Sequence, residues 1–554
     1  MINNKQYQHY LSLLLILFLG IFLRFWQLDL KPLWMDEIIT SLFSLGKNYN
    51  DVPLEVVLPV ENFQKIFTFN PGLSCSQIAE NLANQSTHPP LFFCWMYGWL
   101  GWLRYLGNGW VFQVRSLPAI FGIATIIAIY FVNRIAFSPK SGLMAALVMS
   151  VSPFAVYLSQ EARHYTLPML LITLSLLGLV QIQRDIEKRQ QVRLWIVLLW
   201  TIINAIGLYI HYFFILALAA EYMTLIAVMY VSQAKNKRDI WLSIILSALG
   251  VGISFLPWIM VMLSHSHRAE TDWVPAPAHI APLYQTFIGW LVMVIALPVE
   301  NQPIVITIVC GLLMIAFGIW IGRLIFQGLT LLWRSPPSHL PTLTLITFCA
   351  CVILEFIALI YITGKDITVV PRYNFVYYPS FCALMAASLG EREKGKRQKI
   401  PYIILLVGFI SCIFVTSNLV FQKPFEPDKV AKNMNLQPES PLVVVMAYRN
   451  NQDIALGLSF AASLQTERIH TFPQSPTKFA FFKQSPDFQS VWQNLSQAKQ
   501  LNNYIDKFNI WIIGPGRRRG EYPQNIAIPT GKICTIDKTH HYRIGIPYQL
   551  YQCP

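Results

Sequence analysis

The sequence predicts an all-α, multi-pass membrane protein that ends in a small α/β or α+β domain outside the membrane. Of the 554 residues, 54% are hydrophobic and only 13% are charged. Apolar runs of about 17 to 25 residues recur along the first three quarters of the chain, and each can cross about 30 Å of hydrocarbon. From residue 422 onward these runs end, and the more polar remainder of about 130 residues has the size of one small domain.

The excess of basic residues agrees with membrane topology better than with a nucleic-acid partner, and we expect no such partner. The chain has 42 Lys and Arg against 28 Asp and Glu, a net charge of +14. Much of the excess lies in short loops between apolar runs, as the positive-inside rule describes for cytoplasmic loops. The basic residues of the loops that we assign to the cytoplasm are Arg134, Lys140, Arg184, Lys188, Arg189, Arg193, Lys235, Lys237, Arg238, Arg323, Arg334, Arg392, Lys394, Lys396, Arg397 and Lys399. The pattern predicts a plasma (inner) membrane protein with about eleven spans, a cytoplasmic N-terminus and an extracytoplasmic C-terminal domain.

An acidic pair follows the first predicted span, which covers about residues 10 to 27. Lys5 precedes this span, whereas Asp36 and Glu37 come after it, so the pair is expected outside. Two adjacent carboxylates beside Trp34 and close to lipid are costly, and we interpret them as functional. The alternative is a solvated loop start in which the pair caps a short helix.

The first outer loop runs from about residue 28 to 112 and ends in an apolar stretch at 91–107. This stretch is short for a span, and Trp95, Trp99 and Trp102 share one helical face within it. An aromatic stripe of this kind suits the headgroup layer, so we predict a helix on the outer surface. An ordinary short span remains the alternative. A second surface segment is predicted at about 284–297.

The C-terminal tail contains two stretches that predict buried strands, 441–446 and 510–513. The segment 514–519, which contains three arginines, has two interpretations, a phosphate contact or a solvated turn. The nine cysteines show no CxxC or Cys/His spacing, and most fit small apolar positions in helices. Cys534 and Cys553 could pair across a hairpin in an oxidising compartment, and free thiols are the open alternative.

The predicted topology brings ionisable side chains from five parts of the chain to one membrane face. These residues are Asp36, Glu37, His88, Glu161, Arg163, His164, His211 and Arg372. Lipid cannot satisfy so many charges, so a water-accessible cavity is implied. Carboxylates can take a proton from an attacking hydroxyl, and arginines present a fork that suits phosphate oxygens. The combination favours group transfer from a lipid phosphate over a transport pathway, whose charges usually lie near the membrane midplane.

Several short motifs together resemble a known family. They are Trp34-Met35-Asp36-Glu37, His88-Pro89-Pro90-Leu91, Arg115-Ser116-Leu117-Pro118, Ser152-Pro153-Phe154 and Ser159-Gln160-Glu161-Ala162-Arg163-His164-Tyr165. Over about residues 10 to 380 the chain resembles bacterial membrane glycosyltransferases of family 39. That family is related to the protein O-mannosyltransferases and the aminoarabinose transferase of lipid A, all of the GT-C fold.

The resemblance implies a polyprenyl-phosphate-sugar donor, transfer with inversion on the outer membrane face, and an acidic residue of the first loop as base. It also implies surface-lying helices in that loop. His88 stands where aminoarabinose transferases carry a lysine, so the identity of the sugar does not carry over. The acceptor, whether lipid, glycan or protein, stays open. A transporter or flippase for a lipid-linked glycan, and an O-antigen polymerase or ligase, are the alternative functions.

We therefore predict a GT-C transmembrane catalytic domain over residues 1–421 and an extracytoplasmic domain over 422–554. The predicted catalytic residues are Asp36 as base, Glu37 and Glu161, and those predicted to bind the donor phosphate are His88, Arg163 and Arg372. Simpler roles remain open for three of them: His88 could shape a turn, Glu161 could pair with Arg163, and Arg372 could anchor the chain at the interface. His164 and His211 are expected to be hydrogen-bonding residues. No cofactor is certain, and a divalent cation, Mg²⁺ or Mn²⁺, at Asp36 or Glu161 stays an open alternative.

Overall fold

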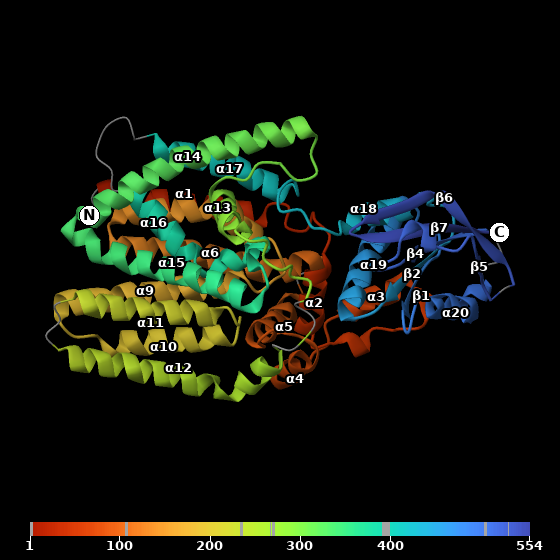
Figure 1. The fold of residues 1–554 in the computed structure, drawn as a ribbon, viewed down its shortest axis with the longest axis horizontal. Helices are drawn as coiled ribbons and strands as arrows, with labels where there is room; N and C mark the ends of the chain where they lie inside the picture. Colours follow the sequence, from red (N-terminus) through yellow and green to blue (C-terminus); the bar gives the residue numbers. More distant parts are fainter. Residues whose placement is uncertain are drawn as a thin grey trace. The chain divides into compact units, whose positions relative to one another are not determined.

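A computed structural model describes residues 4–105, 109–232, 236–265, 268, 272–390, 399–503, 507–529 and 531–554. The chain forms two compact units, which are described separately (Figure 1). The first unit contains Met1–Leu28, Ser86–Phe92 and Phe112–Phe421, and the second contains Asp29–Gln85, Phe93–Val111 and Gln422–Pro554. Most of the first loop therefore packs with the C-terminal tail. The division at residue 422 into a catalytic and an extracytoplasmic domain remains a prediction.

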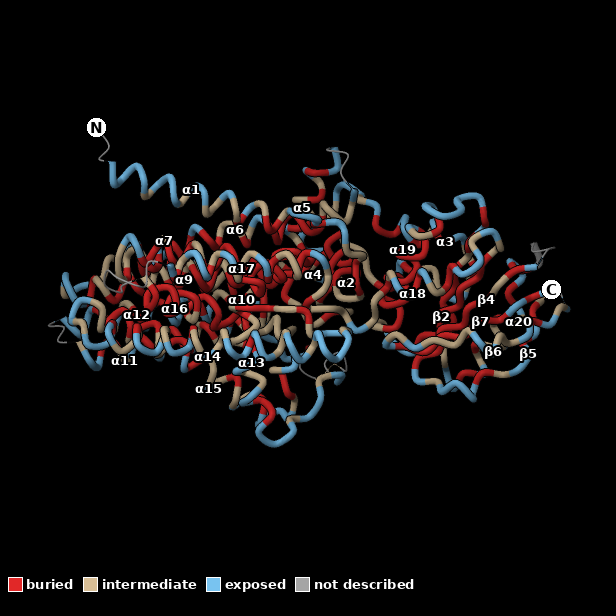
Figure 2. The backbone as a smooth tube through the Cα atoms, turned by 90° about the horizontal axis from the view of Figure 1, so that it is seen from above, coloured by how far each residue is buried: buried red, intermediate tan, exposed pale blue. Residues whose placement is uncertain are grey.

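The first unit is helical, and its apolar helices confirm a multi-pass membrane protein. Its helices are α1 (Asn4–Phe25), α6 (Trp110–Ala136), α7 (Pro139–Ser150), α8 (Pro153–Ser159), α9 (Thr166–Arg189), α10 (Leu194–Leu208), α11 (Phe214–Val231), α12 (Lys237–His265), α13 (Ala281–Val294), α14 (Ile304–Arg334), α15 (Pro336–Thr363), α16 (Tyr378–Gly390) and α17 (Ile400–Thr416), with the 3₁₀ turns η4 (Ile367–Val369) and η5 (Pro371–Val376). Within the described residues, seven helices are long and apolar enough to span, or up to eight if the bent pair α7 and α8 forms one span. Figure 2 shows α1 largely exposed and α9 largely buried. The exposed apolar side chains of these helices, such as Phe18 of α1 and Leu312 of α14, suit contact with lipid.

The sequence also predicts a span at about 141–158, and in the structure two helices, α7 and α8, cover this stretch. α7 and α8 are bent by 59° at the break between them. Pro153 has no N–H to continue the α7 hydrogen-bond ladder. Ser152 instead caps α8, since its Oγ accepts a hydrogen bond from Ala155 N at 3.3 Å. The bend begins the segment that leads to Glu161 and Arg163.

Other parts of the topology prediction keep that status. The stretch 91–107 forms α5 (Leu91–Leu103), and the second predicted surface segment corresponds to α13. Both are shorter apolar helices, and their depth relative to the membrane stays a prediction, as does the count of eleven spans. Five of the basic residues used for the orientation lie outside the described residues: Lys235, Arg392, Lys394, Lys396 and Arg397.

Side chains of the first unit hold the end of α1 in place before the chain enters the first loop. The Gln160 side chain donates from Nε2 to the carbonyl of Trp26 at 2.9 Å. The Arg115 guanidinium donates to the carbonyl of Leu28 at 2.9 Å. Arg24 is fully buried and donates to the carbonyls of Met149 and Ser150. These three side chains thereby provide hydrogen-bond donors to backbone carbonyls that lie away from water.

The second unit contains a sheet, which confirms the predicted α/β or α+β tail. Its strands are β1 (Val57–Pro59), β2 (Leu442–Tyr448), β3 (Thr477–Lys483), β4 (Phe508–Ile513), β5 (Asn525–Ala527), β6 (Ile533–Ile544) and β7 (Ile546–Cys553). The sheet order is β1-β3-β2-β4-β7-β6-β5. β2 pairs in parallel with both β3 and β4, and the other pairs are antiparallel. The two strands predicted at 441–446 and 510–513 correspond to β2 and β4.

Helices connect the parallel strands, and further short helices come from the first loop and the start of the tail. The helices and 3₁₀ turns of this unit are α2 (Met35–Ser44), η1 (Tyr49–Asp51), α3 (Val60–Gln64), η2 (Lys65–Phe67), α4 (Cys75–Gln85), most of α5, α18 (Pro427–Met434), α19 (Asn451–Thr471), α20 (Gln489–Gln497), η6 (Lys499–Asn503) and η7 (Arg519–Glu521). α19 joins β2 to β3, and α20 lies between β3 and β4. Every residue of β2 is buried, as expected of a central parallel strand covered on both faces (Figure 2).

Two disulfides lie in the second unit. Cys534 and Cys553 join β6 to β7, which confirms the pairing that the sequence suggested. Cys75 and Cys94 join α4 to α5, a pairing that the sequence did not reveal. The free cysteines lie in the helices of the first unit: Cys310, Cys349, Cys351, Cys382 and Cys412.

Candidate active site

The acidic pair occupies the first turn of α2 in the second unit. Asp36 is partly exposed, whereas Glu37 is almost completely buried. The Glu37 carboxylate accepts a hydrogen bond from the backbone N–H of Trp34 at 3.3 Å. This bond satisfies a donor that the helix leaves unpaired at its N-terminus. Glu37 therefore has the helix-capping role that was the structural alternative for the pair, and Asp36 presents the more accessible carboxylate.

The segment before α2 is fixed by contacts within the same unit. The Ser459 hydroxyl of α19 donates to the carbonyl of Leu33 at 2.6 Å. The Lys423 ammonium lies 4.5 Å from the centre of the Trp34 ring, a cation–π contact. The N-terminus of α2, where negative charge is favoured, is thus held by two different parts of the tail.

A second group of predicted residues comes together in the first unit, where four connections between helices meet. His88 precedes α5, Arg163 lies in the turn between α8 and α9, His211 lies between α10 and α11, and Arg372 lies in η5. Tyr165, at the start of α9, contacts the other members. We call His88, Arg163, His164, Tyr165, His211 and Arg372 the arginine–histidine cluster.

Two guanidinium groups share one phenol in this cluster. Arg372 donates from Nε to Tyr165 Oη at 3.0 Å, and Arg163 Nη2 donates to the same oxygen at 3.4 Å. The guanidinium carbons lie 5.9 Å and 5.4 Å from the centre of the Tyr165 ring. Cation–π contact and hydrogen bonding thus hold two like charges side by side. Such an arrangement suits an oxyanion that both arginines can reach.

His88 orients Arg163 from the other side. Its Nε2 lies 3.4 Å from Arg163 Nη2, and its Nδ1 lies 2.9 Å from Ser86 Oγ. An arginine can only donate, so Nε2 must accept and Nδ1 carries the proton. Arg268 donates to the carbonyl of Ser86 at 2.7 Å, which holds this short segment. His88 is therefore placed as a neutral partner of Arg163.

The three histidine rings of the cluster contact one another in edge-on and tilted arrangements, and the histidines are uncharged at neutral pH. The ring centres of His88 and His164 are 4.9 Å apart, and those of His164 and His211 are 4.8 Å apart. Burial, and then the charge of the nearby Arg163, lowers the pKa of His211 to about 3. Burial followed by the same kind of charge repulsion holds the pKa of His88 and of His164 well below the usual value. The positive charge of the cluster is therefore carried by the arginines.

Glu161 belongs to the same turn as Arg163. The Arg163 backbone N–H donates to the Glu161 carbonyl at 2.7 Å, and both side chains are buried. Among the described residues, no group of three or more His, Cys, Asp or Glu side chains is arranged to hold a metal ion.

Tyr165 was not among the residues predicted for the site, although it lies in one of the motifs. Its phenol oxygen accepts from an arginine 207 positions away, so no local pattern reveals the contact. Phe375 and Tyr373 also close around the cluster, with the Phe375 ring 4.9 Å from that of His211. Both aromatic residues lie close to Arg372 in the sequence, and this proximity could have indicated that they belong to the site.

The comparisons with known proteins agree with this architecture. Residues 87–262 match the family model of dolichyl-phosphate-mannose-protein mannosyltransferases. The apo crystal structure of ArnT from Cupriavidus metallidurans has a TM-score of 0.54 at 12% identity, and the form bound to undecaprenyl phosphate has 0.52 at 11%. Each match covers 97% of this chain and 97% of the ArnT chain.

A third structure is less similar. The oligosaccharyltransferase of Archaeoglobus fulgidus, tethered with an acceptor peptide, has a TM-score of 0.46 at 12% identity. The match covers 83% of this chain, which spans 63% of the oligosaccharyltransferase chain. No curated protein matches the chain.

The apolar helices and the ArnT likeness together define the class: this is a multi-pass membrane protein with the GT-C fold. Its fold is ArnT-like over nearly the whole chain, with a sheet in the second unit, and its segment 87–262 resembles the mannosyltransferase family. The GT-C fold expected from the motif resemblance is thereby confirmed.

Proposed function

We propose that the chain is a membrane glycosyltransferase that moves a sugar from a polyprenyl-phosphate-linked donor to an acceptor hydroxyl. The arginine–histidine cluster carries this proposal, because two guanidinium groups meet on Tyr165 beside neutral histidines. A phosphate that links a lipid to a sugar has the charge and the oxygen geometry that this pair suits. The crystal structure of ArnT with undecaprenyl phosphate supports the same class of lipid here.

In the proposed reaction, the acceptor oxygen attacks the anomeric carbon while the bond from that carbon to the phosphate oxygen breaks. The leaving phosphate keeps the bonding electron pair, and Arg163 and Arg372 stabilise its growing negative charge. The carboxylate of Asp36 takes the proton of the attacking hydroxyl. Attack opposite to the leaving group inverts the configuration of the sugar. His88, as a neutral partner, holds Arg163 in position.

The carboxylates receive different roles in this scheme. Asp36 is the proposed base because Glu37 is buried and its carboxylate caps α2. Glu37 thus positions the turn that carries Asp36. Glu161, buried in the turn of Arg163, is the alternative base.

We also propose that the second unit lies on the outer side of a plasma membrane. The two disulfides of this unit, Cys75–Cys94 and Cys534–Cys553, support an oxidising compartment. The cysteines of the membrane helices are free. The loop charges, from residues such as Arg134 and Lys140, independently support the same orientation.

The assay that tests the proposed activity separates transfer from transport. Purified protein is given a labelled polyprenyl-phosphate sugar together with a crude acceptor fraction from the envelope. We expect free polyprenyl phosphate to appear together with sugar in the acceptor fraction, and Arg372→Ala to reduce both. Movement of intact labelled lipid across a vesicle membrane, with the sugar–phosphate bond unbroken, would instead identify a flippase. Transfer of a whole lipid-linked chain, rather than of one sugar, would identify a polymerase or ligase.

A further inference from the structure

The second unit contains a cleft at the carboxyl ends of its three parallel strands. The cleft has a volume of about 520 Å³. Arg449 follows β2, Gln484 and Asp487 follow β3, and Arg517 follows β4, so each of the three connections contributes to its lining. Ligand cavities in proteins commonly measure about 300 to 1,000 Å³. The volume therefore suits a small ligand.

The position of the cleft in the sheet is the one at which parallel sheets usually bind ligands. From the central strand β2 the chain moves to β3 on one side and then crosses to β4 on the other. The helices that follow neighbouring strands then leave in different directions, which opens a crevice beyond the carboxyl ends. Arg449 and the segment 514–517 lie at this point, between β2 and β4.

An aromatic–arginine stack forms one wall. The guanidinium of Arg517 lies 4.1 Å from the centre of the Phe488 ring and 5.7 Å from that of Trp492. Arg517 also donates to the carbonyl of Glu521, whereas its buried Nε has no hydrogen-bond partner among the described residues. Gln484, another lining residue, likewise has a buried amide oxygen without a partner there. Both atoms are groups that a polar ligand or a water would satisfy.

Gly516, in the connection after β4, lies close to Arg449, which follows β2. Its φ of +79° is a conformation that favours glycine. A Cβ at this position would lie 3.4 Å from Nη1 of Arg449. Arg449 is fixed from the other side by Asp453, with Nε 3.1 Å from the carboxylate. Within the segment 514–519, Pro515, Gly516 and Arg517 therefore line the cleft, whereas Arg518 and Arg519 are exposed.

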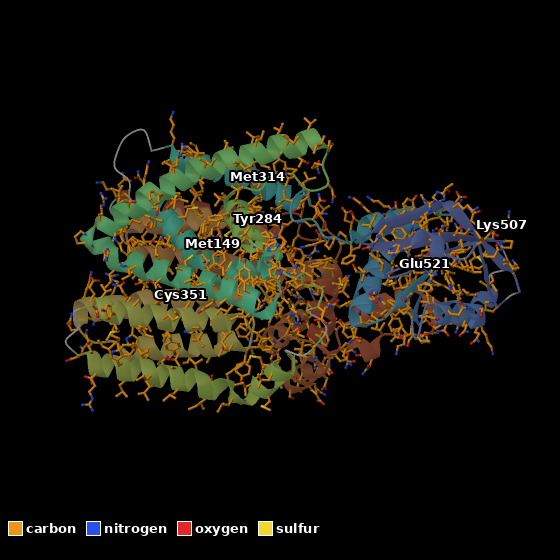
Figure 3. The ribbon with its side chains drawn as sticks, in the orientation of Figure 1. Met149, Tyr284, Met314, Cys351, Lys507 and Glu521 are labelled. Carbon is orange, nitrogen blue, oxygen red and sulfur yellow. A yellow bond between two sulfur atoms is a disulfide. The ribbon has the colours of Figure 1, made fainter. Side chains whose placement is uncertain are left out.

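The charges of the lining identify the class of ligand. Two arginines are balanced by Asp487 and Glu521, and Arg449 is already paired with Asp453. Glu521 is labelled in Figure 3. A polyanion would meet two carboxylates here, which disfavours a phosphate cluster. A saccharide offers many hydroxyl groups, which both donate and accept, and an apolar ring face that suits the face of an aromatic ring.

We propose that this cleft binds a saccharide, with Trp492 against a sugar ring and with Arg449, Gln484, Asp487, Arg517 and Glu521 hydrogen-bonded to its hydroxyl groups. The site is separate from the arginine–histidine cluster, and the inference does not depend on the proposed transfer reaction. It assigns a glycan-binding role to a tail that the motif resemblance does not cover.

Saturation-transfer NMR on the full-length protein in nanodiscs tests this proposal, because glycoside detergents would compete for the site. The probes are mannose, galactose, N-acetylglucosamine, maltose and glucuronic acid, with inorganic phosphate as a separate arm. We expect at least one saccharide to bind and Trp492→Ala to weaken its affinity about threefold to tenfold. Gln489→Trp, which fills the cleft from an exposed lining position, should abolish binding without removing any packed side chain.

The matched control is Arg543→Ala, which removes an exposed arginine of β6 outside the cleft lining and should leave binding unchanged. Arg372→Ala should also leave binding unchanged, even where it stops transfer, so the two proposals fail separately. The inference is wrong if no saccharide binds, if binding persists in Gln489→Trp, or if only phosphate binds in an Arg517-dependent way. Thermal unfolding of each variant shows whether a loss of binding reflects a loss of folding.

Discussion

Arg372 and Tyr165 are joined by a hydrogen bond of 3.0 Å from Nε to Oη, although 207 positions separate them in the sequence. The same phenol oxygen accepts a second hydrogen bond from Arg163. Tyr165 thus sets the spacing of the two arginines before any ligand arrives. Preorganised donors of this kind stabilise developing negative charge more effectively than groups that must reorient during the reaction.

Tyr165→Phe tests this positioning role. The ring and its cation–π contacts remain, whereas the common acceptor of Arg163 and Arg372 is lost. We expect donor affinity to fall by about twofold to tenfold, the equivalent of one ordinary hydrogen bond. Donor titration by isothermal calorimetry measures the change. Tyr402→Phe, at an exposed position of α17, is the control, and equal affinities of the Tyr165→Phe variant and the wild type would exclude the role.

Arg372→Ala should weaken donor binding more strongly, since a charged partner of the phosphate is lost. The expected cost is about 1.5 to 3 kcal/mol, or roughly tenfold to 150-fold in affinity. Arg372→Lys should give an intermediate value, because lysine keeps the charge but not the planar fork. The same titration checks both variants. Identical behaviour of the lysine variant and the wild type would show that only the charge matters at this position.

The buried histidines predict an acid-sensitive fold. His211 Nδ1 accepts a hydrogen bond from Phe213 N at 2.9 Å, a contact that protonation of Nδ1 would remove. The folded pKa of about 3 lies below the unfolded value of 6.5, so between these values the unfolded chain binds more protons. Stability is then full above the unfolded pKa and falls as pH decreases toward 3. One such group accounts for about 2 kcal/mol between pH 7 and pH 5.

The measurement for this prediction is the apparent melting temperature at pH 7 and pH 5. His211→Asn keeps an acceptor near the position of Nδ1 but cannot titrate, so its melting temperature should fall less on acidification than that of the wild type. Parallel decreases in the two proteins would show that His211 does not contribute to the pH dependence.

Cysteine labelling tests the orientation. A cysteine introduced at the exposed residue Gln493 of α20 should react with an impermeant thiol reagent in intact cells. A cysteine at Lys237, at the start of α12, should react only after lysis. Labelling of Gln493→Cys only after lysis would place the second unit in the cytoplasm. The disulfides would then no longer support an extracytoplasmic location.

The sequence was most informative where a structure depends on local composition. Long apolar runs predicted the membrane helices, and apolar stretches bounded by turns predicted β2 and β4, because burial alone accounts for both. β1 was not predictable, since its three residues lie in a loop broken by prolines and become a strand only by pairing with β3. The Cys75–Cys94 disulfide and the contact from Arg372 to Tyr165 also depend on parts of the chain that only folding brings together.

The sequence predicted the residue types of the candidate site but not their arrangement. Motif composition selected His88, Arg163 and Arg372, and these residues do lie together. Motif composition alone could not assign different roles to Asp36 and Glu37. The difference arises from helix geometry, because only the residue three positions after Trp34 can return its carboxylate to that N–H.

The most direct test of the proposed mechanism is the single-turnover rate of Asp36→Asn with donor and acceptor bound. The amide keeps the shape and hydrogen-bonding capacity of the carboxylate but cannot take a proton. Glu37→Gln is the matched control, because its amide oxygen can still cap α2. We expect Asp36→Asn to lose about 10²- to 10⁴-fold in rate with donor affinity unchanged, and Glu37→Gln to lose far less. A rate for Asp36→Asn near that of the wild type would contradict the account and would make Glu161 the better candidate for the base.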